Sequence, residues 1–196
     1  MKMIEPQNCA EPVAVELSGD RTKALDSLLT REEFLEMMKA GNDSKDKAIL
    51  CLGVLGLRAS EISACEAPWV DFSNRTIVIP PRAAKRGKDR IVPFGKIKVV
   101  SEVIIAFFAL EHRIGISRIA IWNRVKRMAS AAAIKHPVTP HGLRATGATW
   151  FAQAGYSITG LQHHFGWSEL RTAQHYVQAS GASAIRDMEE KGEKVF

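Results

Sequence analysis

The stretch Thr139-Pro140-His141-Gly142-Leu143-Arg144 decides how the rest of this chain is interpreted. Pro137 and Pro140 interrupt the preceding segment, because proline cannot continue a helix through its own position. A new helix is therefore expected from about residue 142 to residue 154. His141 and Arg144 stand three residues apart at its beginning, so two side chains able to handle a phosphate and a proton are placed together.

About thirty residues further on, the stretch from Phe165 to Tyr176 ends in one of only two tyrosines in the chain. A phenol, together with His141 and the two arginines Arg58 and Arg144, has the groups needed to attack a phosphodiester and to hold its phosphate. Cleavage of a DNA strand is therefore the first hypothesis to consider.

Residue patterns predict a mainly helical chain. A capping box at Thr30–Glu33 opens a first helix that ends at Gly41, and Ser44 begins a second helix that is apolar on most sides. β-Branched residues predict two strands, at 76–79 and 90–93, separated by turn-forming residues. Further helices are expected at 59–65, 99–110, 117–132 and 157–165, followed by one that carries Tyr176. The predicted fold class is mainly α with a small antiparallel β-sheet (α+β).

The length of 196 residues indicates one domain of ordinary size. Residues 1–28 show no clear periodicity and are interpreted as a leader or linker, residues 29–180 as the folded domain, and residues 181–196 as a C-terminal tail that contacts a neighbouring subunit. The N-terminus lacks the form of a signal peptide, and no apolar run reaches the length of a membrane span. We expect a soluble intracellular protein with no membrane partner.

Positive charge is unevenly distributed along the chain. The net charge of +6 favours a polyanionic partner. Between Glu111 and Glu169 there is no acidic residue, while basic residues recur throughout. The stretch from Arg82 to Lys98 is similarly basic, with Asp89 as its one acid. Such a chain can present a cationic face that neutralises several phosphates, and an ordinary solvated surface is the alternative.

Four separated motifs resemble those of the tyrosine recombinase, or phage integrase, family. In chain order they are Gly56-Leu57-Arg58-Ala59-Ser60-Glu61-Ile62, the basic hairpin ending in Arg90-Ile91-Val92-Pro93, the stretch from Thr139 to Arg144, and Phe165-Gly166-Trp167 nine residues before Tyr176. The resemblance implies that residues 29–180 form a catalytic domain, mostly helical with a small sheet. It also implies site-specific DNA cleavage and rejoining without a metal or other cofactor.

By family position, Arg58 and Arg144 would hold the phosphate to be cleaved. The non-bridging oxygens of a phosphodiester gain charge during attack, and two guanidinium groups offer planar, permanently charged partners for them. Glu61, one helical turn after Arg58, would orient it, with a simple intrahelical ion pair as the alternative. Tyr176 would be the nucleophile and would form a 3′-phosphotyrosine. The alternative is a half-buried tyrosine with a purely structural role.

The remaining roles also follow from the resemblance. Lys85, in the hairpin turn, would protonate the leaving 5′ oxygen, with Lys88 as the alternative because hairpin turns slide in register. His141 would be the general base or a hydrogen-bond partner. Trp167 stands where the family usually has histidine, and its indole N–H can donate but cannot carry a proton. The triplet 161–163 resembles the usual sequence but lies four residues too early.

Other basic residues are expected to contact the DNA backbone: Arg86, Lys88, Arg90, Arg118, Arg124 and Arg127. No metal site is expected, because the adjacent His163 and His164 have no cysteine or carboxylate at ligand spacing. The three cysteines form no C-x-x-C pair, so a disulfide framework is not expected either.

The leading hypothesis is thus the catalytic domain of a site-specific DNA recombinase. It would act in the cytoplasm, associated with the nucleoid, on double-stranded DNA as a homotetramer, with a monomer in solution also possible. A type IB topoisomerase-like enzyme and a DNA-binding regulator that does not cleave are the alternatives. Family members usually carry a DNA-gripping domain before the catalytic one, and residues 1–28 are too few for it. We therefore expect a catalytic part of a longer protein, or another way of encircling DNA.

Overall fold

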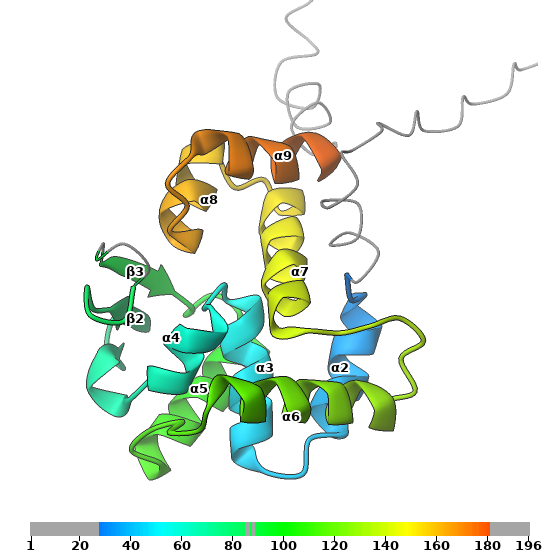
Figure 1. Cartoon of the computed structure of the whole chain (residues 1–196). Helices are drawn as coiled ribbons and strands as arrows, with labels where there is room; N and C mark the ends of the chain where they lie inside the picture. Colours follow the sequence, from blue (N-terminus) through cyan, green and yellow to red (C-terminus); the bar gives the residue numbers. More distant parts are fainter. Residues whose placement is uncertain (1–27, 85–86, 88, 181–196) are drawn as a thin grey trace, which may run out of the picture.

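The computed structural model describes residues 28–84, 87 and 89–180 (Figure 1). The predicted tail, all but the last residue of the predicted leader, and three predicted site residues, Lys85, Arg86 and Lys88, lie outside the described residues. The helices are α2 (Arg31–Lys39), α3 (Ser44–Val54), α4 (Ala59–Ala64), α5 (Lys98–Leu110), α6 (Arg118–Ala131), α7 (Pro140–Gln153), α8 (Ile158–Phe165) and α9 (Leu170–Ser180). The strands are β1 (Val70–Asp71), β2 (Thr76–Ile79) and β3 (Arg90–Pro93), and a 3-10 turn, η1 (Ala67–Trp69), precedes β1.

Hydroxyl side chains begin several of the helices. The capping box of α2 is present as predicted: Thr30 accepts a hydrogen bond from the Glu33 amide at 3.1 Å, and Glu33 accepts one from the Thr30 amide at 2.9 Å. Thr139 caps α7 by accepting from the Gly142 amide, with Pro140 in the first helical position. This cap fixes where α7 starts, and therefore where His141 and Arg144 lie.

Helix α3 is the centre of the fold. It contacts α2, α4, α5, α6 and α7, and all its residues from Ala48 to Val54 are buried. At Gly147 of α7 an added Cβ atom would lie 1.8 Å from the carbonyl oxygen of Val54. Only glycine permits this approach of the two backbones. This close packing fixes the position of α7, and so of Arg144, relative to the end of α3.

The predicted small sheet is confirmed as three antiparallel strands in the order β1-β2-β3. Ile77 pairs with Val92, and both are buried against the helices, whereas Val78 and Ile91 on the opposite face are exposed. The strands therefore alternate between a core face and a solvent face, as expected for a sheet covered on one side.

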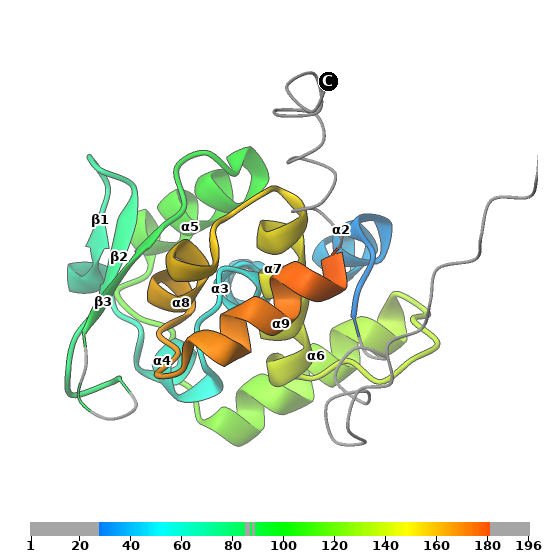
Figure 2. The ribbon, with the colours of Figure 1, turned by 90° about the horizontal axis from the view of Figure 1, so that it is seen from above.

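Figure 2 shows α9 lying across the molecule above α7 and α3, with the sheet at one side and α2 at the other. Helix α8 lies between the sheet and α9, and it contacts both β3 and α9. Within the described ranges, no helix is long and apolar enough to cross a membrane. The arrangement brings the loop after α3, the start of β3, α7 and α9 to one place.

Candidate active site

Arg58 and Glu61 lie at the start of α4, as their spacing predicts. Arg58 is the N-cap residue, and the Glu61 carboxylate accepts a hydrogen bond from its backbone amide at 2.7 Å. The same carboxylate accepts one from Nη1 of Arg58 at 2.8 Å. Glu61 is fully buried, while the Arg58 side chain is 24% exposed. Glu61 therefore holds Arg58 from its buried side and leaves part of the guanidinium open to a ligand.

Arg144 enters the same place from the second turn of α7. Its side chain donates to the backbone oxygens of Gly56 and Phe165, and the residue is only 5% exposed. Burial, followed by the neighbouring charges of Arg58 and Arg90, lowers the pKa of Arg144 to about 9. At neutral pH the guanidinium remains charged. Its two hydrogen bonds fix its plane, so its direction is set before any ligand arrives.

The Gly56 carbonyl oxygen is presented to Arg144 by an unusual backbone conformation. Gly56 has φ of +94°, a region that side-chain-bearing residues rarely adopt, and an added Cβ atom would lie 2.5 Å from the Phe165 ring. The glycine in the first family motif is thus required both by its backbone angle and by the ring packed against it.

The charges at this place do not balance. Among the described residues, the charges of Arg58 and Arg90 act on Arg144, and Glu61 is the acidic residue of this group. Three guanidinium groups and one carboxylate leave two positive charges. Burial raises the pKa of Glu61, but hydrogen bonds from Arg90 and the charges of Arg90 and Arg58 outweigh it, so the pKa lies below its ordinary value. The carboxylate is ionised at neutral pH, and the excess charge suits a bound anion.

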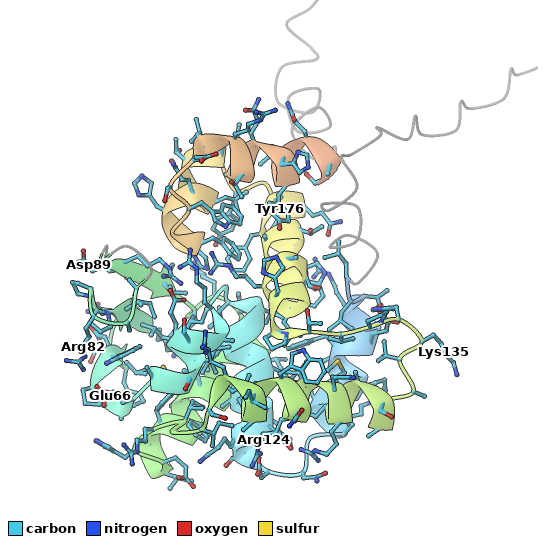
Figure 3. The ribbon with its side chains drawn as sticks, viewed as in Figure 1. Glu66, Arg82, Asp89, Arg124, Lys135 and Tyr176 are labelled. Carbon is cyan, nitrogen blue, oxygen red and sulfur yellow. The ribbon has the colours of Figure 1, made fainter. Side chains whose placement is uncertain are left out.

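Tyr176 lies on α9 over this cluster, on the side of the helix that faces α7 (Figure 3). Its ring stacks in parallel on Trp167, with centroids 5.2 Å apart, and Trp167 stacks in turn on Phe165 at 4.9 Å. Burial raises the pKa of Tyr176, and the positive charge of Arg144 opposes that rise. The phenol is therefore protonated at neutral pH, beside a cation that favours its deprotonated form.

Trp167 packs within the same stack. Its ring centroid is 5.9 Å from the Arg144 guanidinium carbon, and the Phe165 centroid is 5.3 Å from it. The indole therefore stacks on the ring of Tyr176, the predicted nucleophile, and lies close to the guanidinium of Arg144. His163 is exposed on α8, and His164 is buried, with its Nε2 atom 2.9 Å from the Leu55 carbonyl oxygen. His164 is therefore a core residue.

His141, the first histidine of the deciding stretch, is exposed at the start of α7. Partial desolvation by the surrounding protein, with a smaller contribution from the Arg144 charge, lowers the pKa of its imidazole below the ordinary value. The ring is therefore largely neutral at neutral pH, which is the form that can accept a proton.

Arg90 is not placed as expected for a residue that contacts DNA. It opens β3 with its side chain turned inward and only 7% exposed, and it forms an ion pair with Glu61. The alternation of the strand explains this, because exposed Ile91 puts Arg90 and buried Val92 on the inner face. Its charge belongs to the cluster rather than to the outer surface.

The arginines of α6 have different surroundings. Arg118 is exposed, as a DNA contact requires, but Arg124 and Arg127 both bind the buried Asp46 of α3. Arg124 also pairs with Asp43 at 2.9 Å. The reason is geometric: Arg118 and Arg127 are nine residues apart and so lie on about opposite sides of the helix. Figure 3 shows Arg124 at the far end of the molecule from Tyr176.

The described residues thus bring Arg58, Glu61, Arg144, Trp167 and Tyr176 together, with His141 one turn before Arg144. In that part of the chain, no group of three or more histidine, cysteine, aspartate or glutamate side chains is arranged to hold a metal ion. Sequence reasoning missed the structural roles of Gly56, Phe165 and Arg90. The strand alternation at Arg90 was the available signal.

Comparison with known proteins supports the resemblance to the phage integrase family. The sequence matches the model of the phage integrase family over residues 27–182. It is 31% identical over 184 residues to the tyrosine recombinase XerA of Thermococcus onnurineus, an alignment that covers 86% of this chain and 64% of that protein. The chain therefore spans just under two thirds of that relative's length.

Solved structures resemble the fold. A crystal structure of XerA recombinase superimposes with a TM-score of 0.68 at 24% identity, covering 84% of this chain and 64% of that one. The Tn1549 transposon integrase, solved in complex with transposon right-end DNA, gives a TM-score of 0.64 at 20% identity, covering 83% of this chain and 65% of that one.

The helical scaffold with its small sheet is therefore the catalytic-domain fold of tyrosine recombinases. The match of the family model to most of the sequence makes the relationship specific. This chain belongs to the phage integrase family.

Proposed function

We propose that this chain is the catalytic part of a site-specific DNA recombinase that cleaves and rejoins DNA strands through Tyr176. The observation that carries the proposal is the cluster of Arg58, Arg90 and Arg144 with Glu61 as its one acid among the described residues, lying under a half-buried phenol. Its two excess positive charges match the charge of a phosphodiester as an oxygen nucleophile adds to it.

Each arginine has a distinct part in this proposal. Arg58 is the more exposed of the two motif arginines and would bind a non-bridging oxygen directly. Arg144 uses two of its donors on backbone oxygens, and its remaining N–H groups would serve the same phosphate. Because the surrounding protein already holds both groups, little reorganisation accompanies the charge build-up in the transition state.

In the proposed reaction the Oη atom of Tyr176 forms a bond to phosphorus, and the bond from phosphorus to the 5′ oxygen breaks. The phenol proton passes to a base, for which neutral His141 is the candidate. The leaving 5′ oxygen takes a proton from an acid, which the family resemblance assigns to Lys85, with Lys88 as the alternative. The resulting 3′-phosphotyrosine keeps the bond energy, so the reverse reaction can join a new 5′ hydroxyl.

Trp167 has two proposed functions. Its face supports the Tyr176 ring, which limits the directions in which the hydroxyl can turn. Its indole N–H would donate to a phosphate oxygen, as the resemblance implies, while proton transfer is left to other groups.

Double-stranded DNA is the proposed substrate. The Tn1549 integrase, which shares this fold, was solved with DNA, and the exposed Arg118 and Lys126 of α6 give this chain cations for a polyanionic surface. We expect Arg86 and Lys88 to contact the backbone as well. Exchange between two duplexes requires four strand cleavages, so we propose that four subunits assemble on two sites.

The direct test is covalent capture on nicked duplexes drawn from a sequence library. Cleavage of such a duplex releases a short fragment, and the loss of this fragment prevents rejoining. Wild-type protein should form an adduct that survives denaturing electrophoresis. Tyr176→Phe should bind the same duplexes and form none. Tyr156→Phe is the matched control, because Tyr156 is the other tyrosine and is exposed on the surface. An adduct formed by Tyr176→Phe would reject the proposal.

Two further outcomes identify the alternatives. Plasmids carrying paired captured sites should exchange strands, and relaxation without exchange would indicate a topoisomerase-like enzyme. Tight binding by wild-type protein with no adduct on any duplex would indicate a DNA-binding regulator.

Assembly has its own test. If the tail contacts a neighbouring subunit, deleting residues 183–196 should weaken formation of the higher-order complex on DNA, measured by sedimentation. Single-subunit binding should be unchanged. Equal assembly by the truncated protein would exclude this role of the tail.

A further inference from the structure

Arg90 is the residue of the charged cluster to which the family motifs assign no reacting role. It begins β3 opposite Ile79 of β2, and its side chain points inward between α4 and α8. This arginine makes more polar contacts than either of the motif arginines. Its burial and its contacts together indicate a specific task.

The contacts with Glu61 use both ends of the carboxylate. Nη1 of Arg90 donates to Oε1 at 2.8 Å, and Nη2 donates to Oε2 at 2.7 Å. This bidentate arrangement fixes the plane of the carboxylate as well as its position. Arg58 approaches the same two oxygens, with its backbone amide on Oε2 and its Nη1 on Oε1. Glu61 is therefore a shared acceptor through which Arg90 fixes Arg58.

Arg90 also binds the backbone on both sides of the site. Its Nε atom donates to the His164 carbonyl oxygen at 3.1 Å, and its Nη2 donates to that of Gly56 at 3.3 Å. The Gly56 oxygen is the one that accepts from Arg144. At Gly166 an added Cβ atom would lie 2.8 Å from Cδ of Arg90. The side chain thus packs against the turn that leads to Trp167.

We propose that Arg90 is a positioning residue for strand cleavage, which fixes the Glu61 carboxylate and, through it, the direction of the Arg58 guanidinium. The inference rests on the proposed function, because it assigns a task within that reaction. Arg90 itself does not touch the phosphate. Without it, Arg58 would be the one side chain still hydrogen-bonded to Glu61 among the described residues, and Arg58 would turn inward toward the acid, away from the Gly166 carbonyl oxygen that its Nη2 atom binds at 3.0 Å.

The first test is a double-mutant cycle on adduct formation. Arg90→Gln should slow capture by about 10- to 100-fold, since a small misplacement of a binding group can cost on the order of 100-fold. Glu61→Gln should slow it similarly, and adding Arg90→Gln to Glu61→Gln should change the rate little further. Multiplied effects of the two substitutions would overturn the proposal, because Arg90 would then act independently of Glu61.

DNA binding separates positioning from direct contact. Arg90→Gln should keep the wild-type affinity and its dependence on salt concentration. A salt slope reduced by about 0.9 would show that Arg90 neutralises a phosphate, and the proposal would be overturned. Arg82 provides the matched control, because it also forms a 2.7 Å ion pair with a glutamate, Glu66, but its side chain is 72% exposed. A cycle on Arg82→Gln and Glu66→Gln should leave the capture rate at the wild-type level.

A third readout does not depend on cleavage. The chemical shift of the Glu61 carboxyl carbon can be followed by NMR as the pH is changed in DNA-free protein. The signal is assigned by its absence in Glu61→Gln. The groups that act on Glu61 are Arg58, Arg90 and Arg144, so loss of Arg90 should move the titration midpoint upward. An unchanged midpoint would overturn the proposed link between Arg90 and Glu61. Failure of the wild-type protein to form any adduct would reject the proposed function instead, and the titration would still report on the link.

Since Arg90 is buried, the thermal unfolding of each variant must be measured alongside. Should Arg90→Gln not fold, Arg90→Lys gives the same readouts. Lysine keeps a charge near Glu61 but cannot bridge both carboxylate oxygens and the two backbone carbonyls, so capture should slow by about tenfold. A wild-type rate with lysine would overturn the proposal.

Discussion

Two clusters in the described part of the chain have the same composition, a fully buried carboxylate with two arginines. In one, Glu61 binds Arg58 and Arg90 at 2.8 and 2.7 Å. In the other, Asp46 binds Arg124 at 2.7 Å and also binds Arg127. Each acid also accepts a backbone amide near the start of a helix, at 2.7 and 2.9 Å. By composition and contact distance they are nearly equivalent.

The difference lies in what surrounds each cluster. Asp43 joins Arg124, so two acids balance two arginines at the Asp46 cluster. At the Glu61 cluster the additional charge is Arg144, and two positive charges remain. Two ion clusters with the same core therefore have opposite uses: the balanced one ties α6 to α3, and the unbalanced one is suited to bind an anion. Net charge identifies the site better than the presence of ion pairs does.

The largest expected effect comes from an Arg→Lys substitution made once in each region. Arg144→Lys keeps the charge but loses the planar donors, so adduct formation should fall by about 100- to 1000-fold. Arg127→Lys should leave the rate of adduct formation within about twofold of wild type, because its partner Asp46 also binds Arg124, which Figure 3 shows far from Tyr176. Rates of covalent capture measure both. Equal losses would remove the distinction between the regions.

Neutralising the two acids should separate activity from stability. Asp46→Asn should lower the free energy of unfolding by about 1–3 kcal/mol, because two arginines and the Asn42 amide lose a charged acceptor. The capture rate per folded molecule should remain at the wild-type level. Glu61→Gln should reduce that rate even under conditions where the protein is fully folded. Urea unfolding and single-turnover capture provide the two measurements, and loss of capture in Asp46→Asn would contradict the comparison.

Lowering the pH should reduce the stabilisation that each of the two clusters provides, by different amounts. The pKa of Glu61 lies below its unfolded value of about 4.3, so the ionised acid stabilises the fold above that pH, and this contribution is lost as the pH falls through the folded pKa. The difference in unfolding free energy between wild type and Glu61→Gln should therefore shrink below about pH 4. Burial raises the pKa of Asp43, but hydrogen bonds from Arg124 and the Asp46 amide outweigh it. Since Asp43 is half exposed, Asp43→Asn should show the same trend with a smaller amplitude.

The smallest expected effect concerns salt. Arg118 is exposed and should release about one counterion when DNA binds, so Arg118→Gln should reduce the slope of log affinity against log salt by about 0.9. Arg124 is held by two acids, so Arg124→Gln should leave the slope unchanged. Titrations of labelled duplex at several salt concentrations test both variants. A reduced slope for Arg124→Gln would mean that DNA displaces Asp43 and Asp46.

Most of the fold was predictable from the sequence, because its signals are local. The capping box at Thr30, the β-branched strands and the proline before α7 each gave an element boundary within one or two residues of the observed one. The meeting of Arg58, Glu61, Arg144 and Tyr176 was foreseen only through the family motifs. No local pattern places residues more than a hundred positions apart next to one another.

The sequence did not show which arginines are engaged within the fold. Arg124 and Arg127 were predicted to contact DNA because they are basic and lie on an amphipathic helix, and in the structure both form ion pairs with acids about eighty residues earlier in the chain. Whether an arginine is free depends on tertiary contacts that the sequence does not display. The inward direction of Arg90 was readable from the alternation of Arg90, Ile91 and Val92, since its neighbour Ile91 is exposed.

The parallel stacking of Trp167 on Tyr176 also makes the fluorescence of Trp167 sensitive to the position of the Tyr176 ring. Indole emission responds to its immediate surroundings, and this indole has one face against the phenol ring and also stacks on the ring of Phe165. Rotation of the tyrosine out of the stack would uncover that face to water or to a sugar. Emission spectra of a variant that retains only this tryptophan could therefore follow the motion of Tyr176 in real time, without any attached dye.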